Sequence, residues 1–273
     1  MRSEDFKHIK YEKEDNGIVT VTLNWPERKN ALSPLGLLEL WYALDIADKD
    51  RDVKVMIITG SEEANAFSSG GYFSQDILEQ IPAEHRTEVN LRDMASKKLC
   101  LKFWDFSKPV IAAINGLAVG GGFTLPVICA DLSYMADDAW FGFFFVKRAV
   151  MPDFATTILL PLMVGMNRAK ELFYFGERLS AQEAERLGLV NKVLPKNELM
   201  PFVREKALKL IPPKGPTLSI KLMKKTIHSY FRDIIEKQLD LENRAWGKTI
   251  ISKDFKESLK ALKEKRDPIF IGK

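Results

Sequence analysis

The sequence predicts an α/β fold, and three features lead to this prediction. Residues 53–59 form a continuous apolar run, as in a strand buried on both faces. Segments with strand character alternate with segments of helical apolar spacing over the first two-thirds of the chain. Beyond residue 197 only helical patterns follow. We therefore expect an α/β core over residues 1–197 and a helical region over residues 198–273.

The individual elements follow from local signals. Residues 6–24 predict two strands joined by a turn at Asp15-Asn16-Gly17, and Pro26 to Asn30 is expected to be a polar loop. A helix is predicted to begin at Ser33-Pro34, because serine caps free amides and proline fits the first helical position. The remaining expected elements are a helix around 89–103, a strand over 109–114, and helices over 199–210, 216–230, 234–246 and 254–265.

The composition is ordinary for a globular chain, with 46% apolar residues, 29% charged residues and a formal charge of +4. No apolar run reaches the roughly 20 residues that span a bilayer, and the first 14 residues lack a signal peptide's apolar stretch. We expect a cytoplasmic protein with no membrane partner. Cys100 and Cys129 lie in apolar surroundings and are expected to be buried thiols. Three histidines are expected at the surface: His8, His85 and His228. No Cys/His spacing indicates a metal site.

Two glycine-containing segments are candidates for ligand binding. The first, residues 66–73, holds small residues and Gly70-Gly71, which permit close approach of a ligand to the backbone. In the second, a strand over 109–114 leads to Gly120, Gly121 and Gly122 at the start of a helix. Unpaired amides at a helix N-terminus favour an anion or a developing oxyanion. Each segment alone is more typical of a tight turn or close packing, and the second does not match the G-x-G-x-x-G dinucleotide pattern.

Together, the order and spacing of these segments resemble the enoyl-CoA hydratase/isomerase (crotonase) family. Residues 26–32, 176–190 and 264–266 also resemble the family, so the likeness covers nearly the whole chain. It implies a crotonase-like ββα spiral core with a C-terminal helical trimerisation region. It also implies an acyl-CoA substrate, no cofactor beyond the coenzyme A of that substrate, and an oxyanion hole formed by the amides of Gly71 and Gly121.

The acid–base residue departs from the family pattern. The positions of the two glutamates that family hydratases usually carry are Thr124 and Phe145 here. The resemblance instead implies Asp153, the site of the working carboxylate in certain enoyl-CoA isomerases, ring-opening isomerases and a dehalogenase. An aspartate at this place is also a favoured helix cap. Nearby phenylalanines are expected to form an apolar pocket wall that raises the pKa of Asp153, although strand alternation must point some of them into the core: Phe141, Phe143, Phe144, Phe145 and Phe154.

The expected function is that of an enoyl-CoA isomerase with Asp153 as its single base. The alternative is an enoyl-CoA hydratase, possibly acting on a cyclic dienoyl-CoA, in which Asp153 activates water with help from Thr124 or Tyr72. A hydrolase of carbon–carbon bonds is less favoured. The dehalogenase would need a histidine where Leu101 stands. A non-catalytic RNA-binding homologue, using the lysines of residues 220–225, is disfavoured by the small net charge, so no nucleic-acid partner is expected.

The resemblance also implies the residues that contact coenzyme A and the acyl group. Lys265 corresponds to a family lysine that reaches the nucleotide of a neighbouring subunit, although such charges often only solvate a terminal helix. A homotrimer or a dimer of trimers is expected. The implied substrate contacts are Arg28, Ala31, Ala66, Ser68, Ser69, Gly70, Tyr72, Gly120, Thr124, Phe145 and Lys265.

Overall fold

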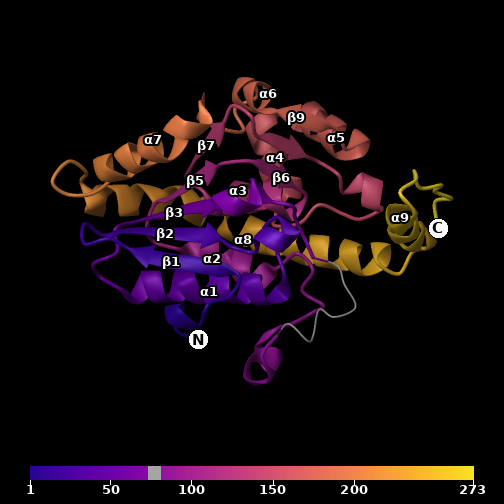
Figure 1. The fold of residues 1–273 in the computed structure, drawn as a ribbon, viewed down its shortest axis with the longest axis horizontal. Helices are drawn as coiled ribbons and strands as arrows, with labels where there is room; N and C mark the ends of the chain where they lie inside the picture. Colours follow the sequence, from indigo (N-terminus) through magenta and orange to yellow (C-terminus); the bar gives the residue numbers. More distant parts are fainter. Residues whose placement is uncertain (73–80) are drawn as a thin grey trace.

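The computed structural model describes residues 1–72 and 81–273, whose strands form two sheets (Figure 1). β1 pairs with β2 and β8 with β9 in antiparallel fashion, and the other neighbours are parallel. The larger sheet has the order β1 (Ile9–Lys13), β2 (Ile18–Leu23), β3 (Val55–Gly60), β5 (Val110–Ile114), β7 (Leu132–Ala136), β10 (Lys192–Leu194). The smaller has the order β4 (Ala66–Ser68), β6 (Leu117–Val119), β8 (Trp140–Gly142), β9 (Arg178–Ser180).

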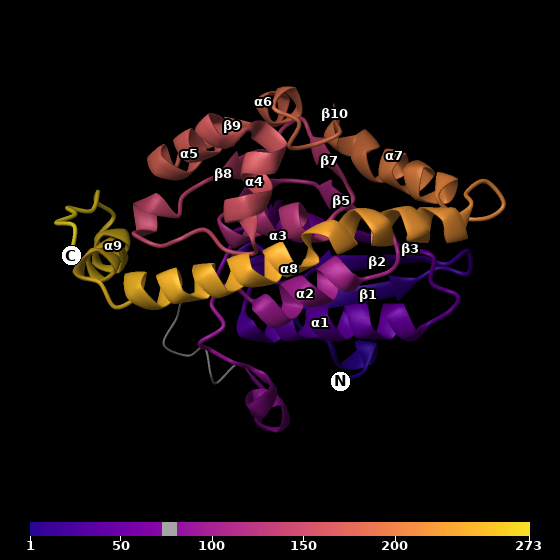
Figure 2. The same cartoon turned by 180° about the vertical axis from the view of Figure 1, so that it is seen from behind.

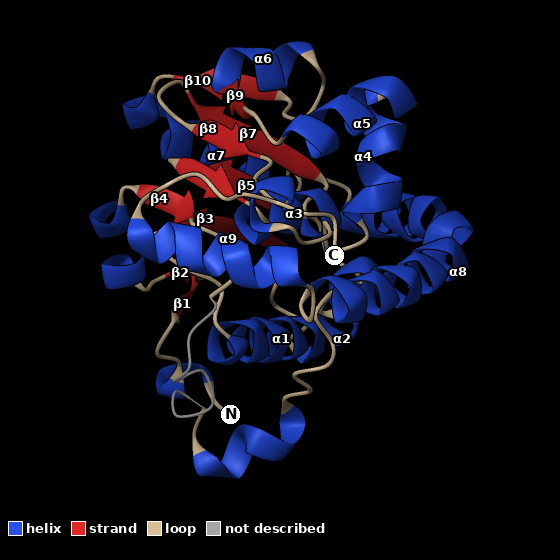
Figure 3. Ribbon diagram, turned by 90° about the vertical axis from the view of Figure 1, so that its right-hand side faces the viewer, coloured by secondary structure: helices blue, strands red, loops and turns tan. Residues whose placement is uncertain are grey.

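Helices surround these sheets. α1 packs on β1 and β2, and α7 packs on β3, β5 and β7. α8 extends along the core and contacts α2 and α4 (Figure 2). The strands gather in the upper part of Figure 3, with α1 and α2 beneath them. The bounds are α1 (Pro34–Lys49), α2 (Lys97–Asp105), α3 (Gly121–Cys129), α4 (Thr156–Val164), α5 (Met166–Phe175), α6 (Ala181–Arg186), α7 (Lys196–Lys209), α8 (Thr217–Thr249) and α9 (Lys253–Glu264).

Several local predictions are confirmed. The turn between β1 and β2 uses Gly17 with a φ of +88°, and the Asn16 side chain accepts a hydrogen bond from the Ile18 amide at 2.9 Å. The Ser33 hydroxyl caps α1 by accepting the Gly36 amide at 3.0 Å. Every residue of β3 is buried, as the apolar run predicted. Within the described ranges, no strand follows β10.

Two helix predictions are wrong in their bounds. The helix expected around 89–103 is α2, which begins only at Lys97 because the Asp93 carboxylate accepts the amides of Lys97 and Lys98 at 2.7 and 3.1 Å. Residues 89–96 are irregular instead. The helices expected at 216–230 and 234–246 are one continuous α8 of 33 residues. An ion pair from Arg232 to Glu236 spans the expected break.

The histidines are not simple surface residues, which corrects that expectation. His8 is partly buried, stacks on Trp25 with ring centroids 4.2 Å apart, and burial lowers its pKa to about 4. His228 stacks on Trp104 at the same distance. Cys100 and Cys129 are buried free thiols, as predicted.

Candidate active site

The two loops expected to bind coenzyme A are joined by hydrogen bonds. The Ser69 amide donates to the Lys29 carbonyl and the Ser69 hydroxyl to the Arg28 carbonyl, both at 2.9 Å. The Ser68 hydroxyl donates to the Asn30 carbonyl at 2.7 Å. Residues 28–31 and 66–70 therefore form one unit, which brings together most of the substrate contacts that the resemblance implied, including Ala31 and Ala66.

Glycines allow this unit to contact the start of α3. Gly70 has a φ of +91°, and a Cβ on it would lie 2.3 Å from the Val119 carbonyl oxygen. A Cβ on Gly122 would lie 2.3 Å from the Ser68 carbonyl oxygen. Both distances are too short for any side chain, so the close approach of the two backbones requires glycine here.

Two free amides lie next to each other at this contact. Leu32 donates to the Gly70 carbonyl at 2.8 Å and accepts from the Tyr72 amide at 3.1 Å, a bridge that leaves the Gly71 amide unused. Gly121 is the first residue of α3, where an amide has no intrahelical partner. Neither amide donates a hydrogen bond within residues 1–72 and 81–273. A Cβ on Gly121 would lie 3.5 Å from the Gly71 nitrogen, so the two residues that carry these amides lie close together.

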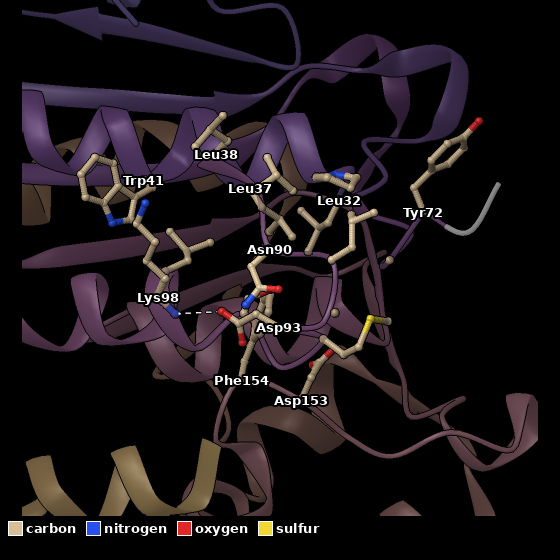
Figure 4. Close-up of a pocket in the computed structure, with 18 of the residues that line it drawn as sticks. Leu32, Leu37, Leu38, Trp41, Tyr72, Asn90, Asp93, Lys98, Asp153 and Phe154 are labelled. Carbon is tan, nitrogen blue, oxygen red and sulfur yellow. Dashed lines mark hydrogen bonds between the residues drawn. The ribbon is translucent and has the colours of Figure 1, made fainter. Parts of the chain in front are cut away.

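Both amides border a cavity of about 270 Å³ (Figure 4). Its walls are mainly apolar, and Figure 4 shows Asp153 and Trp41 on opposite sides of it. A mainly apolar cavity that also contains some polar groups is typical of small-molecule sites. The lining residues come from the loop before α1, α1, the loop after β4, the 88–99 segment, the start of α3, the loop before α4, and α8. The apolar and aromatic ones are Leu32, Pro34, Leu37, Leu38, Trp41, Tyr72, Val89, Leu91, Met94, Leu99, Phe154 and Trp246, and the others are Gly71, Glu88, Asn90, Asp93, Ser96, Lys98, Gly121 and Asp153.

Asp153 is the buried carboxylate beside the two amides. It is 9% exposed, its Oδ1 accepts a hydrogen bond from the Thr124 hydroxyl, and its Oδ2 lies 3.9 Å from where a Cβ on Gly121 would stand. The N-cap of α4 is Ala155, and no side chain caps that helix. The alternative that Asp153 only caps a helix is therefore not supported by its contacts.

The surroundings of Asp153 make it basic enough to act near neutral pH. Burial, the largest effect, raises its pKa to about 7. The hydrogen bond from Thr124 acts in the opposite direction, and the negative charge of Glu242 raises the pKa further. A carboxyl group with such a pKa, next to two unpaired amides in an apolar cavity, is suited to proton transfer next to a developing oxyanion.

The expected phenylalanine wall needs correction. Of the five phenylalanines, only Phe154 lines the cavity. Phe141 and Phe143 pack in the core on Phe123, at centroid distances of 4.9 and 4.3 Å, because alternate side chains of the strand region face inward. Phe145 is buried on Gly120, with its ring 3.8 Å from where a Cβ on that glycine would stand, and does not line the cavity.

The expected basic residues lie outside the cavity. Arg28 is exposed, with its guanidinium carbon 5.8 Å from the Tyr72 ring centroid. Lys265 is exposed directly after α9. In the lysine cluster at 220–225, Lys224 is buried and paired with Asp131 at 2.8 Å, so it is not part of an exposed basic surface.

Sequence reasoning missed the contribution of α8 to this site. Trp246 lines the cavity, and Glu242 accepts hydrogen bonds from the segment that follows Asp153. The signal was present, because Ile235, Leu239, Glu242 and Trp246 recur at helical spacing as one buried face. A glutamate within an apolar stripe indicates a buried, hydrogen-bonded charge.

In the described part of the chain, no helix is both long and apolar enough to cross a membrane. The same residues contain no group of three or more His, Cys, Asp or Glu side chains arranged around a possible metal ion.

Comparisons with known proteins identify the family of this chain. The family model described as "Enoyl-CoA hydratase/isomerase" matches residues 13–273. The chain is 34% identical to a crotonyl-CoA hydratase of Syntrophomonas wolfei over 98% of this chain and 99% of that protein. It is 33% identical to the mitochondrial methylglutaconyl-CoA hydratase of Mus musculus, over 100% of this chain and 85% of that protein.

Solved structures show the same fold. An enoyl-CoA hydratase from Mycobacterium avium subsp. paratuberculosis superposes with a TM-score of 0.83 at 27% identity, covering 97% of this chain and 99% of that chain. An enoyl-CoA hydratase/isomerase from Pseudoalteromonas atlantica gives a TM-score of 0.82 at 26% identity, covering 97% of this chain and 100% of that chain. The fold is thus crotonase-like, and the chain belongs to the enoyl-CoA hydratase/isomerase family of acyl-CoA enzymes.

Proposed function

We propose that this chain is an enoyl-CoA isomerase in which Asp153 is the only base. The observation that carries the proposal is the position of the Asp153 carboxylate beside the free amides of Gly71 and Gly121. The Asp153 carboxylate removes a proton from the carbon next to the unsaturated bond. The negative charge moves to the thioester oxygen, which accepts hydrogen bonds from the two amides. The same proton then returns to a different carbon, so the double bond shifts.

Enoyl-CoA hydration is the second candidate. It is supported by the names of the relatives, since the S. wolfei and M. musculus proteins are both called hydratases. In this reaction Asp153 removes a proton from water, and the water oxygen attacks the β-carbon to give the enolate. The protonated Asp153 then returns that proton to the α-carbon, so one molecule of water is added across the double bond. The hydroxyl of Thr124, which already donates to Asp153, would orient the carboxylate.

The experiment compares Asp153→Asn with the parent on two probes, 3-hexenoyl-CoA for isomerisation and crotonyl-CoA for hydration. Loss of the base should lower kcat by ~10²- to 10⁴-fold on the probe that the enzyme uses. Asp137→Asn, the same substitution at an exposed turn, is the matched control and should leave kcat unchanged. Parental turnover by Asp153→Asn would refute this assignment of the base, and faster turnover of crotonyl-CoA by the parent would favour the hydratase.

We also propose a homotrimer or a dimer of trimers, with no cofactor beyond the coenzyme A of the substrate. Exposed apolar side chains on α8 and near the C-terminus support assembly. In this assembly Lys265 binds the nucleotide phosphates of a neighbouring active site. The exposed apolar residues include Leu218, Leu222, Met223, Ile227, Tyr230, Ile234, Leu262 and Ile269.

A further inference from the structure

Glu242 is a buried carboxylate on α8 that holds the backbone next to Asp153. It is 1% exposed and accepts the Ala155 amide at 2.8 Å, the Thr157 amide at 3.1 Å and the Thr157 hydroxyl at 2.5 Å. Burial of a charged group is costly unless hydrogen bonds compensate, and three donors do so here. All three donors lie within four residues of Asp153.

The turn between Asp153 and these donors has an unfavourable backbone conformation. Phe154 and Ala155 both have φ values of +56°, a left-handed region that residues with a Cβ rarely adopt. Two successive residues of this kind persist only where neighbouring groups fix them. The bond from the Ala155 amide to Glu242 fixes the end of this turn, and the bond from Thr124 to Asp153 fixes its start.

We propose that Glu242 is a positioning residue for Asp153. Its carboxylate holds the Phe154–Ala155 turn so that the Asp153 carboxylate stays beside Thr124 and Gly121. This inference rests on the proposed function, in which Asp153 is the base.

The groups around Asp153 come from three helices. Thr124 on α3 donates to it, Glu242 on α8 places a negative charge near it, and the Cys100 thiol on α2 lies within the field of both carboxyl groups. Burial holds the pKa of Cys100 far above its usual range, so this thiol is neutral. Burial also raises the pKa of Glu242 to about 7. Burial is the largest cause of the raised pKa of Asp153, and Glu242 is the nearby charged group that raises it further.

The next residue on α8 holds the other side of the cavity. Asn243 accepts the Ala95 amide at 2.8 Å and donates to the Asp93 carboxylate at 2.8 Å. Met94, between these two residues, lines the cavity. One turn of α8 thus fixes the backbone next to Asp153 and the backbone around Met94 in the cavity wall.

The test uses Glu242→Gln, with Glu39→Gln as the matched control. Glu39 is also fully buried on a helix and accepts three amides, those of Lys7, His8 and Ile9 at 2.8, 2.8 and 3.1 Å. It does not line the cavity. Glu242→Gln should lower kcat by ~10- to 100-fold, as for a base displaced by about 1 Å, with little change in KM. Its activity on crotonyl-CoA or 3-hexenoyl-CoA should also begin to rise at a lower pH than that of the parent.

The control and a second variant separate charge from position. Glu39→Gln should lose stability but keep the parental kcat and pH profile. Glu242→Asp retains the charge but shortens its reach, so kcat should fall while the pH midpoint stays near that of the parent. If Glu242→Gln and Glu242→Asp both keep the parental kcat and pH midpoint, Glu242 is merely structural and the inference is overturned.

A measurement without substrate distinguishes this inference from the proposed function. The Asp153 carboxyl carbon is titrated by ¹³C NMR and identified by the signal that Asp153→Asn removes. The midpoint should be lower in Glu242→Gln and unchanged in Glu39→Gln. An unmoved midpoint together with a parental kcat of Glu242→Gln rejects the inference alone. Parental activity of Asp153→Asn rejects the base assignment and with it any catalytic consequence of Glu242, even if the midpoint moves.

Discussion

At the scale of single residues, the proton affinity of Asp153 results from opposing contacts. Burial and the charge of Glu242 raise its pKa, and the hydroxyl of Thr124 lowers it. The net value of about 7 exceeds that of an aspartate in an unfolded chain, which is near 4. At pH values between these two pKa values, the folded state binds more protons than the unfolded state. The Asp153 carboxyl group therefore stabilises the fold most at low pH.

The first prediction concerns stability against pH. As pH rises from about 4 to 7, the ionisation of Asp153 should reduce the free energy of unfolding by up to about 1.4 kcal/mol for each pH unit. Asp153→Asn removes this loss, so its stability relative to the parent should be greater at pH 8 than at pH 4.5. Urea denaturation at both pH values measures the difference. A difference that does not vary with pH would contradict the folded-state pKa.

The sequence predicted some residues of the candidate site better than others. Gly71, Gly121 and Asp153 were found because glycine motifs and a departure from a family pattern are visible along the chain. Phe145 was predicted to contact the substrate, but its side chain packs on Gly120 and does not line the cavity. The direction of this side chain could not be predicted from the sequence. Glu242 was missed because its partners lie more than 80 residues away, although its place in an apolar stripe could have indicated burial.

At the scale of elements, the site depends on the contact between the loop after β4 and the start of α3. The backbone carbonyl of Ser68 occupies the space where a side chain on Gly122 would stand. This contact sets the spacing of the Gly71 and Gly121 amides. Elements whose limits depend on distant partners were predicted less well, as at α2, where Asn243 binds the Ala95 amide just before the helix begins.

Gly122→Ala should therefore separate the two amides. We expect it to reduce stability by about 1–3 kcal/mol, as in overpacked cores, and to lower kcat because one oxyanion donor moves. Gly247→Ala on α8 is the control, since a Cβ there has no neighbour within 4 Å. It should be stabilising by about 0.5–1 kcal/mol and keep kcat. Thermal unfolding and steady-state kinetics test both variants, and equal behaviour would refute the argument.

At the scale of the whole molecule, α8 and the C-terminal segment expose many large apolar side chains. The sequence predicted the helical character of this region but not its exposed surface, because an apolar residue at helical spacing reads the same whether it is buried or exposed. The expected assembly should appear in sedimentation velocity as a mass of three or six times the 31.1 kDa chain. A monomer at micromolar concentration would contradict the assembly.

The role of Lys265 gives a prediction at the same scale. Lys265→Ala should raise KM for crotonyl-CoA by ~2- to 5-fold, the effect of an exposed charge pair worth up to about 1 kcal/mol. It should not affect crotonyl-pantetheine, which lacks the nucleotide. Lys263→Ala, at another exposed lysine of α9, is the control. An equal rise in KM for both substrates would show that Lys265 does not bind the nucleotide.

Much of the cavity wall comes from parts of the chain that carry no proposed reacting group. Leu37, Leu38 and Trp41 come from α1, and Val89 to Met94 come from an irregular segment, whereas the amides and Asp153 belong to α3 and the loops beside it. Substitutions in α1 and in the 89–94 segment can therefore change the acyl preference. The two amides and the Asp153 carboxylate stay unchanged by such substitutions. Related chains can thus inherit one chemistry and diversify the molecules on which they perform it.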